Sequence, residues 1–96
     1  MSTIRKVVWT NTAKDQLKTI YNYHKEKSLQ GAINLKNDIL SSSKSIHFVE
    51  QYQKDEIEPE YRRIIVGDYK ILYVEENEVV YITKIFSTKR DSVKQI

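Results

Sequence analysis

The sequence predicts an α+β fold in which the elements follow the order β-α-α-β-β-β. Two stretches near the N-terminus carry apolar residues at helical spacing, and a β-rich stretch with two tight-turn signals follows them. We therefore expect an antiparallel helical hairpin packed on one face of a sheet. The length of 96 residues suits one domain over residues 1–96.

The first half of the chain predicts one strand and two helices. Residues 4–9 (IRKVVW) are a short β-prone run, and residues 10–12 (TNT) offer side-chain oxygens for a helix N-cap. The first helix should run to about residue 27, and residues 28–31 (SLQG) should separate it from the second. The apolar stripes are Ala13, Leu17, Ile20, Tyr21 and His24, then Ala32, Leu35, Ile39, Ser42 and Ile46.

The second half predicts an irregular acidic segment and three strands. Residues 47–60 lack periodicity, and their acidic run is most simply a solvated loop. Strands are expected over residues 61–66, 69–75 and 78–86. Gly67-Asp68 fits a type II′ hairpin, because the glycine comes first, and Glu76-Asn77 is expected to form the second turn.

These turns predict which side chains share a face of the sheet. The first turn sets Ile64 opposite Ile71 and Arg62 opposite Tyr73, and the second sets Tyr73 opposite Val80. The core face should carry Ile64, Val66, Tyr69, Ile71, Tyr73, Val80, Ile82 and Phe86. The other face should carry Tyr61, Arg63, Ile65, Lys70, Leu72, Val74, Val79, Tyr81, Thr83 and Ile85.

Arg63 and Lys70 should therefore lie together, exposed, on a face that no helix covers. Thr83 should lie across from Lys70, and Tyr81 opposite Leu72. Two further cations, Arg62 and Lys84, fall on the core face and are expected to reach its margins. Further cations follow near the C-terminus, namely Lys89, Arg90 and Lys94, and would extend one positive patch.

Two interpretations of the cations remain open. Lysines on exposed strands favour solubility and block unwanted edge pairing. Alternatively, the cations neutralise phosphates while Tyr61 or Tyr81 stacks on bases, and any RNA cleavage would rest on cationic stabilisation of the transition state. His24 and His47 favour structural roles, and no spacing indicates a metal site or a cofactor.

Composition narrows the classes of partner and location. Hydrophobic residues make up 40% and charged residues 30%, a typical globular mixture. The formal net charge is +3 and the isoelectric point about 9.1, which permits an anionic partner without requiring one. The sequence has no cysteine, which favours a cytoplasmic location, and it has no apolar run that predicts a signal peptide or a membrane span.

The order of elements resembles that of the RelE/ParE superfamily of bacterial toxins from type II toxin–antitoxin systems. The resemblance rests on WTNTAKDQLKTIYNY (9–23) and on YRRIIVGDYKILYVEENEVVYITKIFSTKRD (61–91). It implies a mainly antiparallel four-stranded sheet that includes the first strand. It also implies a growth-inhibiting toxin held inactive by a cognate acidic antitoxin, and homodimers occur among such toxins.

The resemblance implies two activities. RelE-like members cut mRNA on the ribosome with basic residues, and Lys70 and Arg90 fall on such catalytic positions, while Arg63 lies near another. ParE-like members poison DNA gyrase without cutting RNA. Lys70 lacks the bidentate fork of the arginine at the matching RelE-like position, and the C-terminal tyrosine of many RelE-like toxins is missing. Both departures weaken the interpretation as an mRNA nuclease.

We therefore expect a ParE-like toxin with DNA gyrase as its target, with Arg63, Lys70, Tyr81, Lys89 and Arg90 as binding residues. The alternatives are a ribosome-dependent mRNA endonuclease and a degenerate member that only binds an antitoxin.

Overall fold

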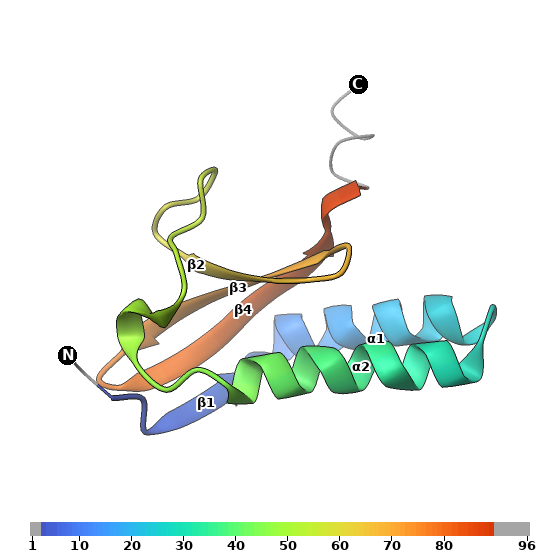
Figure 1. Cartoon of the computed structure of the whole chain (residues 1–96), viewed down its shortest axis with the longest axis horizontal. Coiled ribbons are helices and arrows are strands. Elements are labelled where there is room, and N and C mark those ends of the chain that lie inside the picture. The colour runs from blue at the N-terminus through green and yellow to red at the C-terminus, as the bar shows by residue number, and fades with distance from the viewer. Residues whose placement is uncertain (1–2, 90–96) are drawn as a thin grey trace.

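The computed structural model describes residues 3–89 and confirms the predicted order of elements (Figure 1). A helical hairpin follows the first strand, and three strands complete the sheet. The elements are β1 (Lys6–Trp9), α1 (Asn11–Lys25), α2 (Leu29–Lys44), a short 3₁₀ helix η1 (Val49–Gln51), β2 (Arg62–Val66), β3 (Tyr69–Glu76) and β4 (Val79–Ser87).

Both helices begin at side-chain caps. The Thr10 hydroxyl accepts a hydrogen bond from the Ala13 backbone N–H, as the TNT signal predicts. Ser28 caps α2 in the same way by accepting from the backbone N–H of Gly31. The expected break at residues 28–31 is wrong in one respect, because Gly31 lies in the first turn of α2 rather than in the connection.

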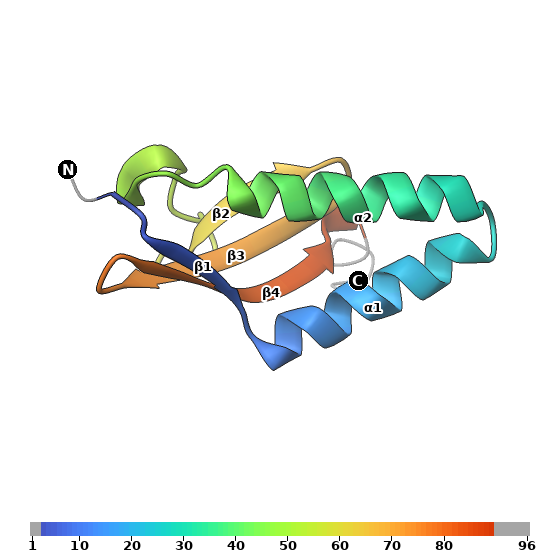
Figure 2. The ribbon, with the colours of Figure 1, turned by 90° about the horizontal axis from the view of Figure 1, so that it is seen from below.

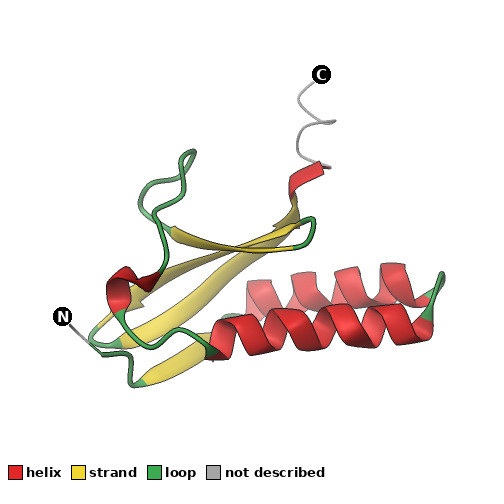
Figure 3. Ribbon diagram, in the orientation of Figure 1, coloured by secondary structure: helices red, strands yellow, loops and turns green. Residues whose placement is uncertain are grey.

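The four strands form one sheet in the order β1-β4-β3-β2, with β1 parallel to β4 and the other pairs antiparallel. Both helices lie on the same side of this sheet, and the closed end of their hairpin projects past it (Figures 2 and 3). The loop between η1 and β2 rises on the opposite side (Figure 1).

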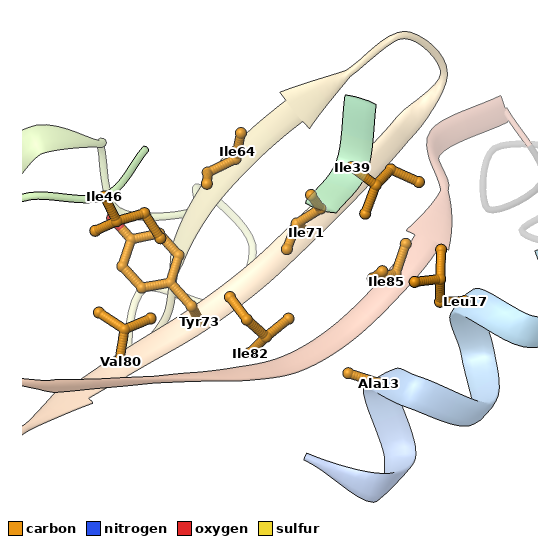
Figure 4. Packing of buried hydrophobic residues seen from close by; sticks show 10 residues of the cluster. All are labelled: Ala13, Leu17, Ile39, Ile46, Ile64, Ile71, Tyr73, Val80, Ile82 and Ile85. Carbon is orange, nitrogen blue, oxygen red and sulfur yellow. The ribbon is translucent and has the colours of Figure 1, made fainter. Parts of the chain in front are cut away.

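The hydrophobic core lies between the helices and the sheet. Tyr73, Ile71 and Ile82 are fully buried at its centre, and Ile39 of α2 packs onto them (Figure 4). At one margin the indole N–H of Trp9 donates to the buried hydroxyl of Ser43, 3.2 Å away, so β1 is tied to α2 by a satisfied polar pair.

The β2–β3 register is as predicted. Val66 pairs with Tyr69 and Ile64 with Ile71 around Gly67, whose φ of +57° suits the first position of a type II′ turn. Alternate side chains of β2 and β3, such as Ile64 and Ile71, therefore enter the core, and Arg63 and Lys70 lie on the other face.

The predicted β3–β4 register is wrong. The turn residues are Asn77 and Glu78, both with positive φ, and not Glu76-Asn77. This backbone is that of a type I′ turn, and the Glu75 carboxylate holds it by accepting the Glu78 N–H at 2.7 Å. Tyr73 consequently pairs with Ile82 instead of Val80, a shift of two residues that leaves the faces unchanged.

A β-bulge then reverses the faces in the second half of β4. The register shifts between Leu72 and Tyr73, so Thr83 is the surplus residue, and its hydroxyl donates to the Leu72 carbonyl. Beyond it Ile85 enters the core, while Lys84 and Phe86 lie on the other face. The expected placements of Ile85, Phe86 and Lys84 are therefore wrong, and the bulge spares the core a buried ammonium group.

Candidate functional site

The sheet face opposite the helices, here called the outer face, holds the cations that the sequence singles out. Pairing sets Arg63 beside Leu72 and Lys84 on the other side of Leu72. Lys70 pairs with Ile65 and Phe86. Three cations thus surround a fully buried leucine, although no helix covers this face.

Residues 53–61, which we call the acidic strap, cover part of the outer face. The strap runs alongside the start of β2, where the backbone N–H of Arg63 donates to the Gln53 carbonyl and the Asp55 N–H donates to the Tyr61 carbonyl. The Arg63 guanidinium also donates to the Lys54 carbonyl, at 3.3 Å. The strap therefore begins as a short extension of the sheet edge.

Asp55 reaches from the strap into the outer face. Its side chain is 1% exposed, and its Oδ1 lies 2.8 Å from the Lys70 ammonium and 3.9 Å from the Arg63 guanidinium. Its Oδ2 accepts the backbone N–H groups of Ile57 and Glu58. Burial raises the pKa of Asp55, but the Lys70 ammonium and the two backbone N–H groups outweigh it and hold the pKa below 3.8.

A second ion pair extends the network. Lys84 lies 3.3 Å from a carboxylate oxygen of Glu58 and over the ring of Tyr61. Lys70 similarly lies over the ring of Phe86. The three cations of this face therefore meet three strap carboxylates, those of Asp55, Glu56 and Glu58, so the network is close to neutral.

The structure brings together only part of the predicted set. Arg63 and Lys70 share Asp55 as expected from their diagonal register. Tyr81 pairs with Val74 rather than Leu72, and no described interaction joins it to the two cations. Lys89 lies beside Asp68 at the β2–β3 turn, where it is 75% exposed. Arg90, like Lys94, lies outside the described residues.

Two expectations about the network itself are wrong. Arg63 and Lys70 are not exposed, since their side chains are only 21% and 14% accessible. The acidic run is not simply a solvated loop, because Asp55 is buried while its neighbour Glu56 is exposed. Sequence reasoning missed Asp55, although an aspartate that bonds backbone N–H groups two and three residues on is a recognisable turn signal.

A separate hollow of about 850 Å³ lies between α1 and the ends of β3 and β4. Ile20, Tyr23 and His24 line it from α1, and Tyr69 and Ile85 line it from the sheet. A His24 ring nitrogen lies 2.7 Å from the Tyr69 hydroxyl, so this histidine has the structural partner that its helical position predicts. Lys89 lies on the rim of the hollow.

Within residues 3–89 no three His, Asp or Glu side chains gather closely enough to hold a metal ion. No helix in the same part of the chain has the length and apolar character needed to cross a membrane.

Comparisons with known proteins identify the fold and the family. The family model described as ParE toxin of type II toxin–antitoxin system, parDE, matches residues 7–92. The fold is similar to a structure of the chromosomal ParDE system from P. aeruginosa, with a TM-score of 0.77, 17% identity, and coverage of 88% of this chain and 96% of the other. It is also similar to the RelB-RelE antitoxin-toxin complex from Methanococcus jannaschii, with a TM-score of 0.51, 19% identity, and coverage of 92% and 95%. A search of curated proteins gave no match.

Proposed function

The chain belongs to the ParE toxin family of type II toxin–antitoxin systems, and from this we propose that it stops growth by inhibiting DNA gyrase. The matched region begins at the second residue of β1 and includes both helices and the other three strands. The proposed action is binding rather than hydrolysis.

The closed Asp55 network is the observation that favours gyrase over RNA cleavage. A cation that stabilises a cleaved phosphate must face the substrate with its charge available. Lys70 instead lies 2.8 Å from a buried carboxylate of its own chain, and Arg63 shares the same carboxylate. With the two cations engaged internally, an RNA nuclease would lack its central charge.

We assign the gyrase contacts to the C-terminal end of the described chain. Lys89 is largely exposed at the β2–β3 turn, and its pairing with Asp68 at 3.4 Å is of the weak surface kind. Arg90 follows it directly in the sequence. In this assignment Lys89 and Arg90 meet gyrase, whereas Arg63 and Lys70 hold the acidic strap.

A cognate antitoxin is the second part of the proposal. Both structural neighbours come from toxin–antitoxin pairs. The hollow beside α1 combines apolar side chains with two lysines, Lys27 and Lys89, and two aspartates, Asp15 and Asp68, so its apolar lining is what would anchor an antitoxin segment. A homodimer over the same surface is the competing arrangement and would appear as a doubled mass in light scattering.

The test is tightly controlled expression of the wild-type chain in bacteria. We expect growth to stop, plasmid supercoiling to fail and bulk mRNA to stay intact. Purified protein should inhibit supercoiling of relaxed plasmid by gyrase. Lys89→Ala combined with Arg90→Ala should weaken that inhibition, and Lys14→Ala combined with Lys18→Ala on α1 provides a charge-matched control that should not.

Loss of mRNA before any change in supercoiling would overturn the gyrase proposal and favour the endonuclease. Folded protein with no effect on growth or on gyrase would leave a member that only binds its antitoxin. Co-expression of the neighbouring acidic reading frame, if one adjoins the gene, should restore growth.

A further inference from the structure

Backbone hydrogen bonds hold the base of the acidic strap beside β2, and charge rather than apolar burial holds its remaining part on the sheet. Asp55 is the only residue of the strap that is buried. Ile57, the one aliphatic side chain in the segment apart from Pro59, is 76% exposed near the tip. Burial of apolar surface therefore contributes little to holding the tip on the sheet.

The site that Asp55 occupies has the features of an oxyanion site. An ammonium group at 2.8 Å, a guanidinium group at 3.9 Å and two backbone N–H groups at 2.9 and 3.1 Å surround a single carboxylate. Positive groups and backbone N–H donors are the partners that phosphate takes in proteins. Lys70 and Arg63 belong to the sheet, whereas the two backbone donors move with the strap.

We propose that Asp55 is an internal gate on a latent anion site formed by Lys70 and Arg63. With the carboxylate in place the outer face takes up no external oxyanion. When a phosphate-class anion competes for the two cations, the strap loses its main anchor and lifts. This inference bears on the proposed function, which rests on the closed state of the network, but its test measures anion binding alone and does not involve gyrase.

The variant Asp55→Asn tests the gate with little change in shape. The asparagine oxygen can still accept the N–H groups of Ile57 and Glu58, but the side chain no longer carries a charge for Lys70. Glu58→Gln is the matched control, because it changes the net charge equally on the same strap and touches Lys84 instead. Inorganic pyrophosphate at low ionic strength is the probe, with binding measured by calorimetry.

Asp55→Asn should bind pyrophosphate about tenfold or more tightly than Glu58→Gln, the change expected for one freed charge-assisted contact. Wild type should bind no better than Glu58→Gln. Adding Lys70→Met to Asp55→Asn should remove the gain. Equal affinities for the two single variants, or wild-type binding as tight as that of Asp55→Asn, would overturn the proposal.

A measurement on the wild type decides the matter if Asp55→Asn does not fold. Amide exchange at Ile57 and Glu58 reports whether their bonds to Asp55 are intact. Pyrophosphate should speed exchange at these two amides relative to sodium chloride of equal ionic strength, while exchange at Ile71 in the core should not change. Unchanged exchange at both strap amides at high pyrophosphate would refute the gate.

Discussion

Replacing Lys70 with methionine should destabilise the fold far more than the same replacement at Lys84. Methionine keeps most of the side-chain length but removes the charge, so the change isolates the ion pair. Lys70 is 14% exposed and meets a buried carboxylate, whereas Lys84 is 40% exposed and meets a partly exposed one. The two pairs lie on the same face, which makes Lys84→Met a close control.

The burial of Asp55 sets the size of the effect. Removing one partner of a fully buried pair costs roughly 3–5 kcal/mol, because a buried charge is left uncompensated. Asp55 would keep two backbone N–H bonds and the Arg63 guanidinium at 3.9 Å, so we expect about 2 kcal/mol for Lys70→Met. For Lys84→Met we expect about 0–1 kcal/mol, as for other exposed pairs.

Urea unfolding of both variants and of the wild type measures these differences directly. A loss of about 2 kcal/mol should lower the thermal midpoint by roughly 8–16 °C in a domain of this size. In the Asp55→Asn background Lys70→Met should cost little, since no carboxylate remains to be left unpaired. If Lys70→Met matches Lys84→Met, or costs the same in both backgrounds, the ion pair does not anchor the strap.

Three further predictions concern the stability of variants at Asp55, Tyr73 and Gly67. The pKa of Asp55 lies below its ordinary value of 3.8, because the Lys70 ammonium and two backbone N–H groups outweigh its burial. Its stabilising effect is therefore present above that pH and lost as the pH falls through the lowered pKa, so the stabilities of wild type and Asp55→Asn in urea unfolding should differ at neutral pH and draw together in strong acid. Burial raises the pKa of Tyr73 to about 12, and its hydroxyl makes no hydrogen bond of ordinary geometry among the described residues, only a weak interaction with the Tyr52 backbone. Tyr73→Phe should therefore change the free energy of unfolding by less than about 1 kcal/mol, and a larger loss in urea unfolding would show that the hydroxyl is firmly bonded. Gly67→Ala should lower the free energy of unfolding by about 1 kcal/mol in the same assay. The positive φ alone causes this loss, since an added Cβ meets no atom within 4 Å. An unchanged free energy of unfolding would mean that the turn relaxes.

The elements that local signals specify could be predicted from the sequence. The Thr10 and Ser28 caps lie next to the helices that they start, and the spacing of apolar residues identifies the buried stripe of each helix. The β2–β3 register follows from Gly67, because a two-residue turn fixes the pairing of everything behind it. In each case the deciding interaction lies within a few residues of the signal.

The second half of β4 could not be predicted in this way. Residues 79–86 contain no glycine or proline that marks a bulge, and the only local sign of the change is that a regular strand would put Lys84 on the core face. The bulge is favoured by what lies across the fold. It places Ile85 in the core and lets the Ile85 backbone N–H donate to Gln16 of α1, 2.7 Å away.

In the candidate site, too, local signals predict some residues, and others depend on contacts between distant parts of the chain. The sequence correctly sets Arg63 and Lys70 on one face, because their placement depends only on the hairpin. It misses Asp55, which lies 15 residues before Lys70 in an aperiodic segment and finds its partners only after the sheet has formed. The cations therefore looked exposed when the chain itself supplies their counter-charge.

Because Thr83 is a surplus residue, Ile82 and Ile85 can both face the core although three positions separate them in β4. If Thr83 were paired as in a regular strand, the Lys84 ammonium would point inward and the Ile85 side chain out to solvent, whereas removing Thr83 altogether would leave both neighbours on their present faces. When related sequences are aligned, a one-residue gap at this position is therefore compatible with the same two faces, because the gap removes the bulge and keeps the flanking pairs.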